Sequence, residues 1–231
     1  MGWTEHHYAN SDELVHACAM RLVDALGAAL ASGPRATMAM AGGRTAPPIF
    51  RHLCQQSIDW ERVTVVPTDE RWVEYAHADC NLRQLRESFA APGLTSLPLV
   101  PDVPGAVPDA EFACAQLAEL PAPFSAVMLG MGADGHFASL FPGAQMLAAA
   151  LNPEAKRDAY QIIPEPMPSA GPHPRITLSM ARLLRTRQLM LVISGEDKLQ
   201  TLRRAQNQAN AFPIGALLHA AGSDVDIFWC P

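Results

Sequence analysis

The chain has 231 residues, and because 49% of them are apolar it can form one large α/β domain spanning residues 1–231. Its formal net charge of −6 argues against non-specific nucleic-acid binding, which requires a basic face. The first ten residues lack the apolar core of a signal peptide, and we expect no run of the ~18 apolar residues that a membrane span requires. These features predict a cytoplasmic protein that binds neither nucleic acid nor membranes.

The five cysteines, an odd number with no Cys-x-x-Cys pair, are typical of reduced and mostly buried thiols. No group of cysteines and histidines has the spacing of a structural zinc site. We therefore expect neither a disulfide framework nor a bound metal.

Helices and strands are expected to alternate along the chain. Asn10 and Glu13 form a capping-box pattern that opens a first helix, and Gly33 and Pro34 end it. Apolar and β-branched runs predict strands at residues 36–41, 62–67, 126–129, 160–163, 175–178, 188–194 and 226–229. The intervening patterns predict helices at residues 47–55, 81–89, 109–120 and 196–208.

This alternation predicts an α/β fold with a mainly parallel, Rossmann-like sheet and helices on both faces. Polar residues gather where the predicted strands end, at residues 42–45, 69–71, 134–136 and 195–198. In such sheets ligands bind beyond the carboxyl ends of the strands. We therefore expect these four segments to form the rim of one active site. Five prolines within residues 164–174 predict a rigid loop, and whether it closes over that site is left open.

Residues 130–143, Gly-Met-Gly-Ala-Asp-Gly-His-Phe-Ala-Ser-Leu-Phe-Pro-Gly, are the most informative motif. They contain the Gly-x-Gly-x-x-Gly spacing of dinucleotide-binding turns, which must lead into a continuous helix. Phe141, Pro142 and Gly143 interrupt any such helix, and this argues against a nicotinamide cofactor. Asp134 and His136 place a carboxylate and an imidazole two residues apart in this turn, where they could transfer protons near neutral pH.

The whole motif closely resembles the signature of 6-phosphogluconolactonases. This resemblance implies that His136 is the base that activates water and that Asp134 supports it. The sequence Asp69-Glu70-Arg71 resembles the family's Asp-Glu-Arg motif, whose arginine is expected near the substrate. Asn81 matches a family asparagine, although Cys80 replaces the usual serine.

The same resemblance implies a phosphate site. Gly42, Gly43 and Thr45 match the family's glycine turn, whose backbone amides can cradle a phosphate. Ala41, Arg44 and Ala46 depart from the usual Ser-Gly-Gly-Ser-Thr-Pro, with the loss of two hydroxyls and the gain of a guanidinium that could itself pair with phosphate. Two further cations match the family's Arg-Ile-Thr and Gly-x-x-Lys patterns, namely Arg175 and Lys198.

The resemblance thus implies hydrolysis of 6-phospho-D-glucono-1,5-lactone without a cofactor, and we expect a monomer. A non-catalytic sugar-phosphate sensor is an alternative, because the altered turn at residues 41–46 changes the expected phosphate contacts. A glucosamine-6-phosphate deaminase is a weaker alternative. That family places a glutamate where this chain has Phe141, whose apolar ring cannot perform acid–base chemistry.

Overall fold

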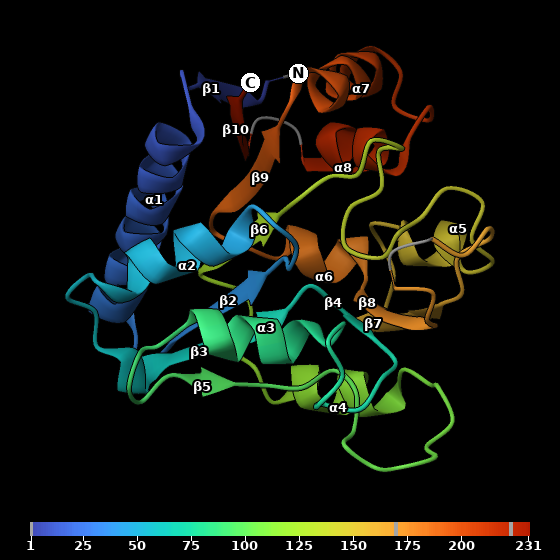
Figure 1. Cartoon of the computed structure of the whole chain (residues 1–231), viewed down its shortest axis with the longest axis horizontal. Coiled ribbons are helices and arrows are strands. Elements are labelled where there is room, and N and C mark those ends of the chain that lie inside the picture. The colour runs from blue at the N-terminus through green and yellow to red at the C-terminus, as the bar shows by residue number, and fades with distance from the viewer. Residues whose placement is uncertain (1, 169–170, 222–223) are drawn as a thin grey trace.

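A seven-stranded sheet in which every pair of neighbours is parallel forms the centre of the protein (Figure 1). The computed structural model describes residues 2–168, 171–221 and 224–231. The strands lie in the order β1 (Thr4–His7), β10 (Val225–Cys230), β9 (Leu189–Ser194), β6 (Ala126–Leu129), β2 (Ala36–Met40), β3 (Val63–Pro67) and β5 (Thr95–Ser96). This arrangement confirms the predicted parallel α/β fold.

Alternate residues of the central strands pack into two apolar layers, because successive side chains of a strand point to opposite faces. In β2, Met38 and Met40 belong to one layer and Ala39 to the other. The first layer is covered by α1 (Ser11–Ser32), α2 (Ala46–Cys54), α3 (Asn81–Ser88) and the 3-10 turn Trp60–Arg62. The second is covered by α4 (Glu111–Ala118), α5 (Leu147–Ala150), α6 (Met180–Leu184), α7 (Glu196–Asn207) and α8 (Pro213–Ala221). Helices therefore lie on both faces, as expected.

A second, three-stranded sheet is antiparallel and was not foreseen. It consists of β4 (Asp69–Arg71), β8 (Arg175–Leu178) and β7 (Ala159–Ile162), in that order. The strands predicted at residues 160–163 and 175–178 lie in this second sheet. Residues 69–71, expected as the polar end of a strand, form its third strand. Sequence periodicity identifies a strand but neither its partner nor its direction. The register places Arg71 opposite Arg175.

Helix α1 begins as the capping pattern predicts. The Asn10 side chain accepts a hydrogen bond from the backbone N–H of Glu13 at 3.0 Å. At 22 residues, α1 also has the length and apolar composition of a membrane span, contrary to our expectation that no such segment exists. Here its apolar face packs against α2 and the sheet, and Arg21 pairs with Asp226 of β10 at 2.6 Å. Core helices of globular proteins have the same length and composition, so α1 is weak evidence for a membrane.

Several elements were not predicted from the sequence, namely β1, β5, α5, α6 and α8. The β1 sequence, Thr-Glu-His-His, is polar, and its strand conformation comes from pairing with β10. His6 of β1 forms a hydrogen bond with Asp226 at 2.8 Å. Strand β10 and Asp226 lie at the opposite end of the chain from β1, so no local pattern reveals this edge of the sheet.

Candidate active site

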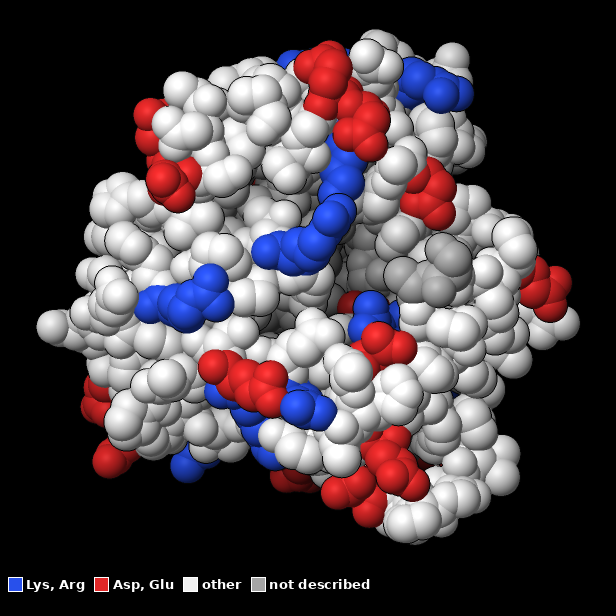
Figure 2. Space-filling model, in the orientation of Figure 1, with Lys and Arg blue, Asp and Glu red and all other residues white. Residues whose placement is uncertain are grey.

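A cleft of about 340 Å³ opens at the carboxyl ends of the central strands. The chain leaves β2 toward β3 and later returns to β6 on the other side of β2, and ligands bind parallel sheets at such reversals of strand order. Ten of the eleven predicted site residues line the cleft: Gly42, Gly43, Arg44, Thr45, Asp69, Arg71, Asn81, His136, Arg175 and Lys198. Figure 2 shows basic side chains gathered around the hollow in the middle of this face.

Asp134, the eleventh residue, is not among the residues that line the cleft but contacts His136. Its Oδ1 lies 2.5 Å from Nδ1 of His136 and also accepts the His136 backbone N–H at 3.3 Å. Burial by itself would raise the pKa of the Asp134 carboxyl, but the hydrogen bond and charge attraction from His136 hold that pKa below its ordinary value. An ionised Asp134 favours a proton on Nδ1, and this leaves Nε2 of His136 as an acceptor.

The turn that carries this pair requires a glycine at position 132. A Cβ atom on Gly132 would lie 2.3 Å from the His136 ring and 2.5 Å from Oδ1 of Asp134. The turn is held from outside by α7 and α8: Thr201 donates its hydroxyl to the Ala133 carbonyl at 2.9 Å, and the backbone N–H of Ile214 donates to the Gly135 carbonyl at 2.9 Å. The His136–Asp134 geometry is thus fixed by backbone and neighbouring helices.

Phe141 lies between the predicted base and a predicted phosphate ligand. Its ring centroid lies 4.2 Å from that of His136, and the Arg175 guanidinium carbon lies 5.5 Å from the same centroid. Aromatic and cation–π contacts of this kind restrict the orientation of both partners. The apolar residue that argued against a deaminase therefore has a structural role beside His136.

The two arginines of the small sheet line the cleft, and each has a buried donor without a partner. Arg71 donates Nη1 to the Asp79 carbonyl and Arg175 donates Nη2 to the Gly171 carbonyl, each at 2.7 Å. Within the described parts of the chain, the buried Nε atom of each guanidinium has no hydrogen-bond partner, and neither has the buried Oδ1 of Asn81. Burial lowers the pKa of Arg175. Because buried polar atoms are rarely left unpaired, these atoms indicate a polar or anionic ligand in the cleft.

The glycine turn and the start of α2 supply a second polar wall. Thr45 precedes α2 without a side-chain capping bond. Because Pro47 and Pro48 have no N–H, the backbone donors at this end of the helix are those of residues 42–46. Arg44 is exposed at the mouth of the cleft, and Lys198, in the first turn of α7, lines it. Backbone N–H groups and cations together suit an anion such as phosphate.

The Asp69 carboxylate forms a hydrogen bond within the protein, since its Oδ2 accepts the hydroxyl of Ser139 at 2.5 Å. Sequence reasoning missed Ser139, although it lies within the 130–143 motif, because residue spacing does not reveal a partner 70 positions away. It also missed Glu70, which is 2% exposed and accepts the backbone N–H groups of Asn81 and Leu82 at 2.7 Å. Glu70 thereby fixes the start of α3 and the position of Asn81.

Comparison with known proteins agrees with this geometry. The family model for glucosamine-6-phosphate isomerases/6-phosphogluconolactonase matches residues 9–229 of this chain. The chain belongs to this family. A 6-phosphogluconolactonase from Rhizobium meliloti (strain 1021) is 34% identical over 98% of this chain and 98% of the relative. One from Mesorhizobium japonicum is 36% identical over 97% and 94%, respectively.

A solved structure extends the likeness to the fold. The crystal structure of a 6-phosphogluconolactonase from Shewanella baltica OS155 is 32% identical, with a TM-score of 0.91 over 99% of this chain and 98% of that one. The family expected from the 130–143 motif is thereby confirmed. Family membership does not by itself test the role of each cleft residue, and those roles remain predictions.

Proposed function

We propose that this chain is a 6-phosphogluconolactonase, which hydrolyses 6-phospho-D-glucono-1,5-lactone to 6-phospho-D-gluconate in the oxidative pentose phosphate pathway. The nearly full-length similarity to proteins of that name supports this activity. The observation that carries the mechanism is the His136–Asp134 pair at the edge of a cleft lined by Arg71, Arg175 and Lys198. We expect the protein to work as a monomer in the cytoplasm.

In the proposed reaction, His136 acts as the general base. Asp134 holds the proton on Nδ1, so Nε2 removes a proton from water as the water oxygen attacks the lactone carbonyl carbon. The imidazolium then donates that proton to the ring oxygen as the C–O bond breaks, which gives the carboxylic acid and a hydroxyl group. One residue thus serves first as base and then as acid, while Asp134 positions its ring.

The cations of the cleft have two proposed tasks. Arg175, Lys198 and the amides of the Gly42–Gly43 turn bind the phosphate, and this places the carbonyl near His136. Arg71 stabilises the negative charge that develops on the carbonyl oxygen during water attack. Arg44 adds a guanidinium at the mouth of the cleft, which offsets the two hydroxyls that its turn lacks.

The test is lactone disappearance, measured with substrate generated in place and spontaneous hydrolysis subtracted. We expect His136→Ala to lower kcat by roughly 10²- to 10⁴-fold while 6-phosphogluconate still binds. The matched control is His52→Ala, which removes a histidine of α2 that does not line the cleft and leaves turnover unchanged. Near-normal turnover of His136→Ala would refute the base assignment.

The same assay separates the alternatives. Binding of 6-phosphogluconate without any acceleration by folded wild-type protein would support a sugar-phosphate sensor. Ammonia release from glucosamine 6-phosphate at an enzymatic rate would support a deaminase, against which stands the Phe141 ring beside His136. Acceleration of lactone hydrolysis by the wild-type protein that is lost in His136→Ala contradicts both the sensor and the deaminase.

A further inference from the structure

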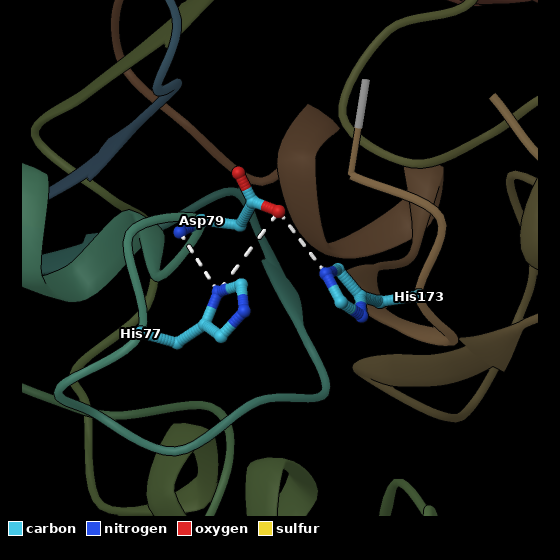
Figure 3. A group of neighbouring side chains, drawn as sticks. All are labelled: His77, Asp79 and His173. Carbon is cyan, nitrogen blue, oxygen red and sulfur yellow. Dashed lines mark hydrogen bonds and ion pairs between the residues drawn. The ribbon is translucent and has the colours of Figure 1, made fainter. Parts of the chain in front are cut away.

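A group of three potential metal ligands lies next to the cleft and has no part in the proposed reaction. Figure 3 shows the imidazoles of His77 and His173 directed at the Asp79 carboxylate from two separate segments. Nε2 of His173 lies 3.0 Å from Oδ2 of Asp79, and Nδ1 of His77 lies 3.9 Å from the same oxygen. One ligand atom from each residue can be chosen so that all three lie within 4.8 Å of one another.

These separations are close to those of a transition-metal site. Ligands bound tetrahedrally to zinc at about 2.0–2.1 Å lie about 3.4 Å apart, so small side-chain rotations would bring all three into place. Two imidazoles and a carboxylate suit zinc and its borderline neighbours, whereas magnesium and calcium prefer oxygen ligands alone. His77 now accepts the Asp79 backbone N–H on Nδ1 at 3.1 Å, a bond that a metal would replace.

The exposure of the group also suits a cation. The His77 side chain is 46% exposed, and water can complete the coordination of an ion there. The positive charge of Arg71 lies close to this group and lowers its affinity for a metal ion.

The backbone around the group is held in place from both sides. On one side the Gly171 carbonyl accepts the backbone N–H of His173 at 2.9 Å and Nη2 of Arg175 at 2.7 Å. On the other side, the backbone N–H of Cys80 donates to the His77 carbonyl at 3.1 Å. A fixed backbone lowers the ordering cost of binding.

We propose that His77, Asp79 and His173 bind one divalent transition-metal ion of the zinc class, which fastens residues 171–174 to the turn before α3. The Asp79 carbonyl accepts Arg71 and the Gly171 carbonyl accepts Arg175, so the ion reinforces the supports of both cleft arginines. Sequence spacing could not reveal this group, because His173 lies 94 residues from Asp79. The proposal does not depend on the lactonase activity.

The test is isothermal titration of the full chain with Zn²⁺ at neutral pH, without substrate. We expect one ion per chain, and an affinity that falls at least tenfold in His173→Ala and in the double variant His77→Ala/His173→Ala. Mg²⁺ should produce no binding heat. In wild-type protein, Zn²⁺ should also slow amide exchange at Gly171, His173 and Arg175. Circular dichroism checks that the variants are folded.

Two controls guard against binding elsewhere. His16 and His52 form another exposed pair, with ring nitrogens 3.1 Å apart but without a carboxylate, and the double variant His16→Ala/His52→Ala should bind Zn²⁺ normally. His136→Ala tests the catalytic pair in the same way. Binding that survives loss of His77 and His173, or that disappears in either control, overturns the proposal, as does the absence of binding to folded wild-type protein. None of these readouts uses lactone hydrolysis, so a failure of the proposed function would be seen separately.

Discussion

Two buried arginines in different regions show how similar local chemistry serves different ends. Arg175 in the cleft and Arg182 in α6 are 3% and 1% exposed, and each guanidinium lies over a phenylalanine ring. Burial lowers the pKa of both. Arg182 lies 4.1 Å from the Phe124 ring centroid and has its own carboxylate, Asp158, 3.6 Å from Nε.

The difference lies in which arginine lines the cleft. Within the described residues, Nε, Nη1 and Nη2 of Arg182 form no hydrogen bond, but Arg182 is not among the residues that line the cleft. Arg175 faces the open cleft beside Asn81 and Arg71, whose buried polar atoms are also unpaired. An unpaired buried cation is therefore a sign of a ligand site when it borders a cavity and other unpaired groups share that cavity.

The strongest test of this comparison is Arg175→Ala. We expect KM for the lactone to rise roughly 30- to 1,000-fold, because loss of one member of a buried charge pair costs a few kcal/mol of binding. The unfolding temperature should fall, because Ala leaves a cavity and the Gly171 carbonyl loses its donor. Steady-state kinetics and thermal unfolding measure both effects. Arg175→Lys should be intermediate, as it keeps the charge but loses the planar donors. An unchanged KM would contradict the phosphate assignment.

Glu70 extends the comparison to a buried acid directly behind the cleft. Burial raises its pKa from 4.5 to about 7, although backbone N–H groups of Asn81, Leu82 and Arg71 oppose the shift. Between these values the folded state keeps a proton that the unfolded state has lost, so stability falls as pH rises from 4.5 to about 7. Glu70 thereby contributes up to about 3 kcal/mol to the free energy of unfolding. This contribution is fully present below pH 4.5 and is lost above about pH 7.

Urea unfolding across this pH range measures that loss. Glu70→Gln has no carboxyl to titrate, so its stability should vary less steeply with pH than that of the wild type. It should also destabilise the start of α3 by about 1 kcal/mol, because an amide nitrogen cannot accept the Leu82 N–H. Identical pH slopes in the two proteins would show that Glu70 does not titrate in this range.

The smallest expected effect is that of Arg182→Met, the counterpart of the Arg175 variant. Methionine fills similar space without a charge, and Arg185 still pairs with Asp158. We expect the stability to change by no more than about 1–2 kcal/mol, and to rise if desolvation outweighs the attraction to Asp158. KM should not change. A raised KM for the lactone in Arg182→Met would mean that Arg182 also affects substrate binding, which would contradict the difference drawn between the two arginines.

Much of the site could be predicted because its signals are local. The glycines at 42, 43, 130 and 132, together with His136, follow buried strands, and the carboxyl ends of neighbouring parallel strands meet at one edge of a sheet. The capping pattern at Asn10 likewise depends on residues within a single turn. Turn chemistry and hydrophobic periodicity are properties of adjacent residues, and they can be read from the chain.

Other features depend on contacts between distant segments. Asp69 was predicted as a substrate ligand, but only the fold shows its carboxylate bound to Ser139. Only the fold shows that residues 69–71 form a strand, pairs β4 with β8 and places Arg71 opposite Arg175.

The sequence by itself determined the alternation of helices and strands, the family and the His136 turn, because these depend on short-range patterns. The tertiary structure alone decided which buried charges are paired, how Glu70 supports Asn81, and that His173 meets Asp79. The physical reason is that burial and ion pairing depend on the summed environment of a side chain, which no window of neighbouring residues contains.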